Sequence, residues 1–371
     1  MRAAGEDERF MALTLELARR GRGSVEPNPM VGAVIVRDGV EIARGWHKRF
    51  GGPHAEREAL AAARDAGLDV RGATMYVTLE PCCHHGKTPP CTEAIIAAGI
   101  ARVVAPMTDP DQNVAGRGVA ALRGAGVEVS LGACEAEARK LLAAYIKGRT
   151  TGRPWVICKW AQTADGCIAL PAGQGKWISS PPSRRRVHEL RGLCDGVCVG
   201  VATVVADDPL LTNRSGDGKA PTRVVLDSRL SLPPDCQLIR TAAAAPVLIA
   251  TTPAAPPAKA DQLRRAGAEV LTLPADQAGV KLEALLQELG RRQWTYLLVE
   301  GGAKVLGSFI YAGLADELIV FICPGKLAPA RPDADAPVPA RFDIADVGKT
   351  IALGQCESRR YGRDVMRRYV Q

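Results

Sequence analysis

The tract Glu80-Pro-Cys-Cys-His-His-Gly-Lys-Thr-Pro-Pro-Cys91, downstream of His54-Ala-Glu56, decides how the first half of this chain is interpreted. Cys82 comes just after a predicted strand that ends at Glu80, and Cys91 comes just before a predicted helix. His54 also precedes a predicted helix, and helix amino termini carry partial positive charge that stabilises nearby thiolates. The three prolines of the tract stiffen a loop whose two ends have to meet.

One imidazole and two thiolates are donors that zinc accepts, and we interpret His54, Cys82 and Cys91 as its ligands. Three protein ligands leave the fourth tetrahedral position for water, which is the arrangement of catalytic zinc sites. The order H-x-E, then P-C, a spacer and a second C is typical of zinc deaminases that act on nucleobase-like rings. Glu56, two residues after the histidine, is then the expected proton carrier.

The same tract leaves alternatives open. Cys83, His84 or His85 could supply a fourth ligand, which would make a structural zinc site in which the nearby glutamate has no task. Otherwise Cys83 is a spectator, and His84 and His85 either contact substrate or cap the loop. Two isolated histidines are interpreted as structural: His47 and His188.

Strands alternate with helices through the first half, which predicts a three-layer α/β sandwich. The predicted helices cover residues 8–20, 55–67, 92–98, 116–124 and 135–147. The predicted strands cover residues 31–36, 74–80, 102–105 and 127–130.

A polar, glycine-rich stretch at 147–154 ends in proline and marks a domain boundary, so we expect one domain over residues 1–150 and another over 151–371. In the second half, predicted strands cover residues 155–160, 196–201, 222–227, 245–250, 269–273, 295–300 and 317–322. Predicted helices cover residues 182–192, 280–290 and 303–312. Two tracts rich in alanine and proline are interpreted as loops: 252–260 and 328–339.

The composition of the chain is that of a globular protein. Its 371 residues are 47% hydrophobic, which is enough for a sizeable core in two or three domains. We expect no signal peptide, because both charge signs precede any apolar run, and no apolar run is long enough to span a membrane. The 11 cysteines, an odd number without a secretion signal, favour the reducing cytoplasm.

The net charge of +8 is compatible with nucleic acids or with small phosphorylated substrates. The basic residues are diffuse, and the densest cluster is Arg184-Arg185-Arg186 with Arg191. Aromatic residues make up only 4% of the chain, whereas single-strand binders stack bases on aromatic side chains. We therefore favour phosphate-bearing small molecules, although a solvated helix face also explains the cluster.

The second half has no GxGxxG after its first strand, so it lacks a Rossmann fingerprint. It has VEGGAKVLGSF at residues 299–309 instead. A strand ends at Glu300, and Gly301-Gly302 lets backbone N–H groups approach a phosphate at a helix start. Such turns also arise for packing reasons, so this motif alone decides nothing.

The motifs taken together resemble a known family. Three segments resemble the deaminase half of the bifunctional riboflavin-biosynthesis deaminase/reductase family: PNPMVGAVIV (27–36), GGPHAEREAL (51–60) and EPCCHHGKTPPC (80–91). Five segments resemble the reductase half of the same family: KWAQTADGCIAL (159–170), KWISSPPSRRRVHELR (176–191), GVATVVADDPLLTNR (200–214), VVLDS (224–228) and LVEGG (298–302). The long spacer between the two cysteines distinguishes this family from cytidine and tRNA-adenosine deaminases.

This resemblance implies a cytidine-deaminase-like three-layer sandwich followed by a dihydrofolate-reductase-like α/β domain. It implies one zinc ion per chain and NADPH as cofactor. The implied reactions are hydrolytic deamination of 2,5-diamino-6-(5-phosphoribosylamino)pyrimidin-4-one and reduction of the ribosyl group to a ribityl chain. The implied partner is this small phosphorylated pyrimidine, not nucleic acid or a membrane, and family members are commonly dimers or tetramers.

The resemblance also assigns residues by position. The implied cofactor contacts are Ala161, Trp177, Thr203, Asp207, Ser228, Gly302, Ala303, Lys304, Val305, Leu306, Gly307 and Ser308. The implied substrate contacts are Asn28, Gly175, Arg191, Leu211, Arg214 and Glu300. Gly175 departs from the family, which often has serine there. Lys159 and Asp165, near the end of the first strand of this half, are expected to position or polarise the sugar.

Two other functions compete with this interpretation. A nucleic-acid-editing deaminase with an RNA-gripping second half agrees with the basic charge but not with the few aromatic residues or the long cysteine spacer. It predicts an affinity for RNA that falls steeply with salt. A zinc-stabilised binding protein without catalysis predicts that Glu56→Gln leaves function unchanged.

Overall fold

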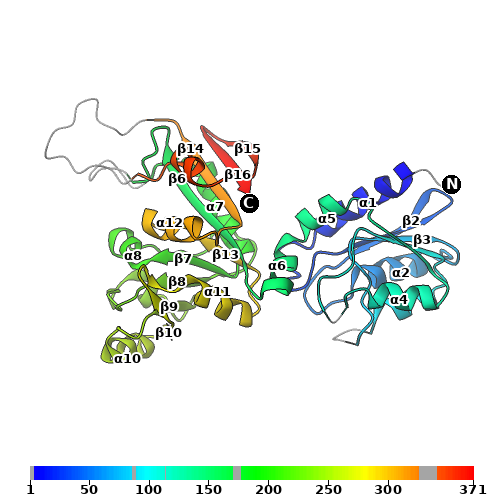
Figure 1. Ribbon diagram of the computed structural model, residues 1–371, viewed down its shortest axis with the longest axis horizontal. Helices are drawn as coiled ribbons and strands as arrows, with labels where there is room; N and C mark the ends of the chain where they lie inside the picture. Colours follow the sequence, from blue (N-terminus) through cyan, green and yellow to red (C-terminus); the bar gives the residue numbers. More distant parts are fainter. Residues whose placement is uncertain (1–3, 86–88, 113, 170–176, 326–340) are drawn as a thin grey trace. The chain divides into compact units, whose positions relative to one another are not determined.

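The computed structural model describes residues 4–85, 89–112, 114–169, 177–325 and 341–371. The chain divides into two compact units, Met1–Gly152 and Arg153–Gln371 (Figure 1), and each is described by itself. In the part of the chain that is described, none of the helices has the length and apolar character needed to cross a membrane.

The amino-terminal unit contains a five-stranded mixed sheet in the order β2-β1-β3-β4-β5. Its strands are β1 (Gly32–Arg37), β2 (Val40–Trp46), β3 (Thr74–Val77), β4 (Arg102–Ala105) and β5 (Glu128–Leu131). Its helices are α1 (Ala4–Arg19), α2 (Ala55–Asp65), α3 (Cys91–Ala97), α4 (Arg117–Gly124), α5 (Glu135–Leu141) and α6 (Ala143–Thr151). Strand β1 is antiparallel to β2 and β3, and β3, β4 and β5 run parallel.

Both faces of this sheet are covered, because alternate residues of β1 point to opposite sides. Ala33 and Ile35 pack with the small side chains of α2 and with residues of α3 and α4. Val34 and Val36 pack on the other face, with Phe10 of α1 and with part of α5. The unit is therefore a three-layer α/β sandwich, as the alternating pattern predicts.

The carboxy-terminal unit contains a nine-stranded sheet in the order β10-β9-β8-β7-β13-β6-β14-β16-β15 and a small β11-β12 hairpin. Its strands are β6 (Trp155–Thr163), β7 (Gly196–Gly200), β8 (Thr222–Leu226), β9 (Val247–Thr251), β10 (Glu269–Thr272), β11 (Ala275–Asp276), β12 (Gly279–Val280), β13 (Tyr296–Val299), β14 (Glu317–Cys323), β15 (Gln355–Tyr361) and β16 (Asp364–Val370). Its helices are α7 (Pro181–Leu193), α8 (Val201–Asp207), α9 (Gln237–Arg240), α10 (Pro257–Arg265), α11 (Leu282–Arg291), α12 (Ala303–Tyr311) and α13 (Ile344–Thr350).

In this sheet the neighbouring strands β10, β9, β8, β7, β13, β6 and β14 are parallel. The strands β16 and β15 add an antiparallel edge next to β14. The carboxyl ends of β6, β13, β7 and β8 consequently meet at one edge of the sheet. Ligands of open α/β sheets bind in the crevice outside these ends. The segments that follow these four strands therefore carry the candidate site of this unit.

Two predictions about local structure are wrong. The expected helix at 135–147 is two helices, because the chain leaves helical geometry at Leu142 (φ −94°, ψ 7°). Leu142 packs with Leu79 and Tyr145, whereas Ala138 packs on the cluster that contains α1. The tract 252–260 is not all loop, because Pro257 begins α10, and proline suits the first helical position. The tract 328–339 lies outside the described residues.

Candidate functional site

Three donor side chains meet in the amino-terminal unit. The Nδ1 atom of His54 lies 3.5 Å from the sulfur of Cys82 and 3.4 Å from the sulfur of Cys91. His54 immediately precedes α2, Cys91 is the first residue of α3, and Cys82 lies in the loop after β3. The ligand atoms of all three lie within 4.8 Å of one another.

This donor set fits a tetrahedral zinc ion. Zinc–sulfur and zinc–nitrogen bonds of about 2.3 and 2.05 Å place tetrahedral nitrogen and sulfur donors about 3.6 Å apart. The two distances from the histidine nitrogen are close to this value. Within the described ranges, no fourth His, Cys, Asp or Glu joins the cluster, so Cys83, His84 and His85 lie outside it.

Cys91 and His54 favour the thiolate form of Cys82, whereas the pKa of Cys91 itself is raised by its side-chain hydrogen bond to Cys82 and by burial. The backbone N–H of Cys91, at the start of α3, donates to the sulfur of Cys82 over 3.3 Å. Hydrogen bonds from the Cys91 side chain and from His54 lower the pKa of the Cys82 thiol. A lowered pKa favours the thiolate, which is the form that binds metals.

Glu56 lies beside this cluster in the first turn of α2, and its side chain is buried. Burial raises the pKa of its carboxyl group, and the nearby Cys82 raises it further. The Oε2 atom has no hydrogen-bond partner among the described residues. A buried carboxyl group with a raised pKa and one oxygen without a hydrogen-bond partner is suited to taking up and releasing a proton.

The carboxylate of Glu80 fixes the loop that carries Cys82. It accepts hydrogen bonds of 2.9 Å from the backbone N–H groups of Asp109, Gly116 and Val119. A Cβ atom on Gly118 would lie 2.1 Å from the carbonyl oxygen of Pro81, so only glycine permits this approach. The start of α4 is thereby tied to the residue next to a candidate ligand.

A cavity of about 260 Å³ opens onto the donor cluster, and Asn28, His47, Glu56 and His84 are among the residues that line it. The Nδ1 atom of His47 lies 2.9 Å from the carbonyl oxygen of Pro53, which can only accept. Nδ1 therefore carries the proton, and Nε2 accepts from the side-chain amide of Asn28 over 3.2 Å. Burial lowers the pKa of His47, which agrees with a neutral ring.

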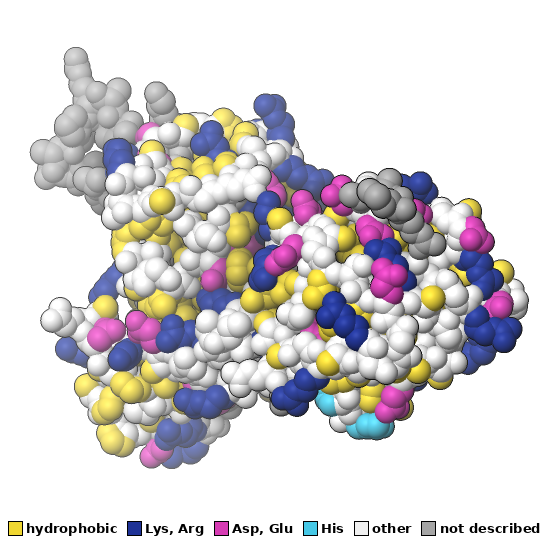
Figure 2. Space-filling model, turned by 45° about the vertical axis from the view of Figure 1, so that its right-hand side comes forward, with side chains coloured by type: hydrophobic (Ala, Val, Ile, Leu, Met, Phe, Trp, Pro, Cys, Tyr) yellow, Lys and Arg dark blue, Asp and Glu magenta, His cyan; other side chains and the backbone are white. Residues whose placement is uncertain are grey.

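The exposed histidines of the loop differ in position. Histidine side chains are visible on the surface of the amino-terminal unit in Figure 2, and His84 and His85 are exposed residues of this unit. His84 lines the cavity, whereas the Nε2 atom of His85 lies 4.0 Å from a carboxylate oxygen of Glu93. This geometry favours a substrate contact for His84 alone.

Sequence reasoning missed part of the cavity wall. Asp109, Asp111, Tyr145 and Arg149 line it. The Tyr145 hydroxyl donates to Asp109 over 3.0 Å, and burial raises the pKa of Asp109 to about 6. Arg149 pairs with Asp111 over 3.4 Å and lies over the ring of Tyr145. These residues belong to no motif, although the run Thr108-Asp-Pro-Asp111 after a predicted strand was a possible signal.

A charged cluster lies at the carboxyl edge of the second sheet. Val299 at the end of β13 pairs with Cys158 of β6, so Glu300 follows beside Lys159. The Lys159 ammonium lies 3.1 Å from Oε2 of Glu300. Arg191 of α7 donates to both carboxylate oxygens, over 2.7 and 3.0 Å. Burial opposes the charge of Glu300, but the two cations outweigh it and lower its pKa to about 2.

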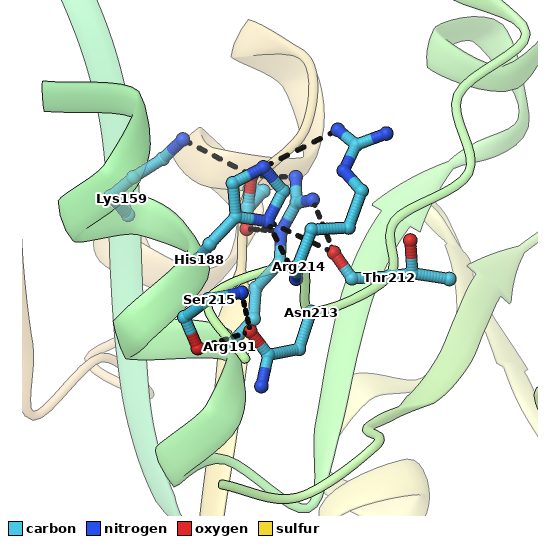
Figure 3. A network of polar contacts seen from close by, with 8 residues as sticks. Lys159, His188, Arg191, Thr212, Asn213, Arg214 and Ser215 are labelled. Atoms are coloured by element: carbon cyan, nitrogen blue, oxygen red, sulfur yellow. Dashed lines mark hydrogen bonds and ion pairs between the residues drawn. The ribbon is translucent and has the colours of Figure 1, made fainter. Parts of the chain in front are cut away.

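Two further expected contacts of this unit, Leu211 and Arg214, lie on either side of Thr212, which contacts this cluster; Figure 3 shows Thr212 and Arg214. The carbonyl oxygen of Thr212 accepts from Arg191 over 3.1 Å, and Arg214 is two residues further on. Leu211 is buried and has a φ of +55°, an uncommon conformation for a side chain of this kind. Asp165 lies beyond the end of β6 and accepts a hydrogen bond from Thr163. Gly175 lies outside the described residues.

A second cavity, of about 780 Å³, lies in the carboxy-terminal unit. Six of the expected cofactor contacts line it: Thr203, Ser228, Gly302, Lys304, Val305 and Ser308. Gly302 has a φ of +62°, and a Cβ atom on Gly301 would lie 2.8 Å from Val199. The two glycines therefore let the turn before α12 approach the end of β7 closely.

The remaining expected cofactor contacts do not line this cavity: Ala161, Trp177, Asp207, Ala303, Leu306 and Gly307. Leu306 points into the hydrophobic core, so only its backbone is available to a ligand. Trp177 is exposed, with Arg184 over its ring at 5.1 Å. Ala161 lies two residues after Lys159 on the same face of β6.

The comparisons with known proteins cover both units. Residues 4–107 match the cytidine and deoxycytidylate deaminase zinc-binding region, and residues 154–331 match the RibD C-terminal domain. The riboflavin biosynthesis protein RibD of Aquifex aeolicus (strain VF5) is 43% identical, covering 86% of this chain and 87% of its own.

Two solved structures are similar over 99% of this chain and 99% of their own. RibD of Acinetobacter baumannii (form 1) is 35% identical with a TM-score of 0.83. A Thermotoga maritima protein described as a diaminohydroxyphosphoribosylaminopyrimidine deaminase/5-amino-6-(5-phosphoribosylamino)uracil reductase is 37% identical with a TM-score of 0.79. The fold expected from the resemblance is confirmed. The chain belongs to the RibD family of bifunctional deaminase/reductase enzymes of riboflavin biosynthesis.

Proposed function

We propose that this enzyme first deaminates 2,5-diamino-6-(5-phosphoribosylamino)pyrimidin-4-one and then reduces the sugar of the product with NADPH. Residues 1–150 form the deaminase domain in this proposal, and residues 151–371 form the reductase domain. The observation that carries it is the meeting of His54, Cys82 and Cys91 beside the buried Glu56. The names of the relatives support the same pair of reactions.

His54, Cys82 and Cys91 would hold one zinc ion, which would lower the pKa of a bound water to about 7. Glu56 accepts the proton of the attacking water on its vacant oxygen. It passes this proton to the ring nitrogen, then takes the second proton from the hydroxyl group added to the ring carbon and gives it to the departing amine, so that ammonia and a ring carbonyl are the products. Asn28 uses its amide N–H on His47 and thereby leaves its amide oxygen for the pyrimidine.

NADPH supplies the hydride for the second reaction, and the protein supplies orientation and charge. The six expected contacts that line the larger cavity, with Lys304 as a cation among them, support a nucleotide there. Glu300, held ionised by Lys159 and Arg191, accepts hydrogen bonds from sugar hydroxyls. Arg214 meets the phosphate, since a guanidinium binds phosphate bidentately. Leu211, the residue before Thr212, is the apolar substrate contact in this proposal.

A small phosphorylated substrate is favoured over nucleic acid. On the face drawn in Figure 2, Lys and Arg side chains are interspersed with Asp and Glu side chains and do not form a continuous stripe. A cytoplasmic location and a homo-oligomeric state, dimer or tetramer, are part of the proposal. The eleven cysteines, all described and none in a disulfide, agree with a reducing compartment.

The test compares Cys82→Ser, Cys91→Ser and Cys83→Ser in the full-length protein. Bound zinc, ammonia release from the diamino substrate and NADPH oxidation on the deaminated product are measured for each. We expect the first two variants to lose zinc and ammonia release and to retain NADPH oxidation, and Cys83→Ser to retain all three. Equal zinc content in all three variants would refute the ligand assignment.

A further inference from the structure

His188 of α7 contacts two neighbours of the charged cluster (Figure 3). Its Nε2 atom lies 3.3 Å from Nη2 of Arg214. Its Nδ1 atom lies 3.1 Å from the carbonyl oxygen of Thr212 and 3.3 Å from the backbone nitrogen of Arg214. The same carbonyl oxygen accepts from Arg191, so the ring lies between the two arginines of the proposed substrate site.

The protonation of this ring follows from its neighbours. A guanidinium has donors and no acceptor, so Nε2 must be the nitrogen without a proton. In a neutral ring the proton is then on Nδ1, which donates to the carbonyl oxygen of Thr212 and cannot accept from the backbone of Arg214. Burial lowers the pKa of His188, and Arg191 and Arg214 lower it further, which agrees with a neutral ring.

Two devices of different kinds hold Arg214. Its backbone is fixed by the turn in which Asn213 accepts from the N–H and the hydroxyl of Ser215 over 2.9 and 2.8 Å. Its side chain is exposed, and among the described residues its guanidinium has one hydrogen-bond partner, Nε2 of His188. The orientation of a long exposed side chain therefore depends on a single acceptor.

We propose that His188 is a positioning residue of the reductase site, which holds the Arg214 guanidinium in the orientation that meets the substrate phosphate. This rests on the proposed function, because it takes Arg214 as the phosphate contact. The bond leaves the other donors of the guanidinium for the ligand. Without this acceptor, the Arg214 side chain samples several rotamers in the free enzyme and loses that freedom when the phosphate binds. The lost side-chain entropy weakens phosphate binding by up to about tenfold.

The chain offers a matched pair of substitutions at this position. The side-chain N–H of His188→Asn replaces the Nδ1 donor to Thr212 but leaves Arg214 without an acceptor. The side-chain oxygen of His188→Gln replaces the Nε2 acceptor. KM and kcat are measured in the full-length enzyme with 5-amino-6-(5-phosphoribosylamino)uracil and with the same compound lacking its phosphate. Arg214→Ala is measured in parallel.

We expect His188→Asn to raise KM for the phosphorylated substrate by up to about tenfold. Its kcat, its KM for the dephosphorylated substrate and its KM for NADPH should stay within about twofold, and His188→Gln should restore KM. Equal KM increases in both variants, an equal effect on both substrates, or no effect would overturn the inference. If Arg214→Ala fails to raise KM for the phosphorylated substrate selectively, the proposed phosphate contact itself is wrong.

Discussion

The two candidate sites treat a buried carboxyl group in opposite ways. Glu56 has an oxygen without a partner, and burial raises its pKa. Glu300 is equally enclosed, but Lys159 and Arg191 surround it and lower its pKa to about 2. A carboxyl that exchanges protons suits hydrolysis, in which protons move between water, ring and amine. A permanent anion suits hydride transfer, in which the cofactor supplies the chemistry and the protein holds the sugar.

Glu56→Gln should give the largest effect, because it removes the proton carrier and keeps the shape of the side chain. We expect ammonia release to fall by about 10³-fold, within the range of general acid–base catalysis. Bound zinc and NADPH oxidation on the deaminated substrate should not change. Normal deamination by this variant would show that another group carries the proton.

Glu300→Gln should give the next largest effect, because it leaves two enclosed cations without their anion. The expected loss of unfolding free energy is about 3 kcal/mol, as for one partner of a buried ion pair. Glu269 is the matched control, since it pairs with Arg292 on the surface of the same unit, and Glu269→Gln should cost less than about 1 kcal/mol. Equal losses in denaturant titrations would show that Glu300 is not charged in the folded protein.

The pH dependence of the Glu300 effect has a definite sign. Its folded-state pKa of about 2 lies below the ordinary glutamate value of 4.5, so its ionised form stabilises the fold. This stabilisation is complete above the ordinary value and is lost as the pH falls toward 2. The difference in unfolding free energy between wild type and Glu300→Gln should therefore stay constant down to about pH 5 and shrink below it. A difference that shrinks between pH 8 and 6 would contradict the low pKa.

The sequence predicted the donor cluster better than the walls around it. The positions of His54, Cys82 and Cys91 follow from local rules, since each lies at a strand end or helix start that the pattern predicts. His47 and Asp109 reach the same cavity through tertiary packing, which no local pattern encodes. The same limit explains why His188 was interpreted as structural.

Among the elements of the fold, buried apolar runs were predicted well and exposed ones poorly. The strand β1 and the strand β14 are continuous hydrophobic runs, and both were predicted to within about one residue. The hairpin of β15 and β16 was not predicted, because its sequence is rich in arginine. Almost all of β15 is exposed, so no apolar alternation marks it.

Glu80→Gln tests whether the deaminase site depends on a carboxylate in a purely supporting role. The Oε2 atom accepts from two backbone N–H groups, and an amide nitrogen in its place would face them. We expect a loss of about 2 kcal/mol from the unfolding transition of the amino-terminal unit. NADPH oxidation should be unchanged, and the exposed Glu93→Gln is the control. A loss equal to that of the control would show that the three backbone contacts contribute little.

Gly302→Ala should give the smallest effect on activity, and Gly313→Ala is the control for alanine at a positive φ without a neighbour. Both glycines have positive φ, of +62° and +66°, so alanine costs about 1 kcal/mol of stability at 313 and more at 302, where ψ is 135° and lies outside the left-handed helical region. Only the Cβ atom at 302 meets a neighbour, the hydroxyl of Thr203 at 3.3 Å, in the wall of the larger cavity. Thermal unfolding should therefore shift in both variants and further in Gly302→Ala, while KM for NADPH rises only in Gly302→Ala. An equal KM for NADPH in both variants would show that the cofactor does not contact this turn. The cluster of Lys159, Arg191 and Glu300 would then be the only part of the second site whose role these experiments support.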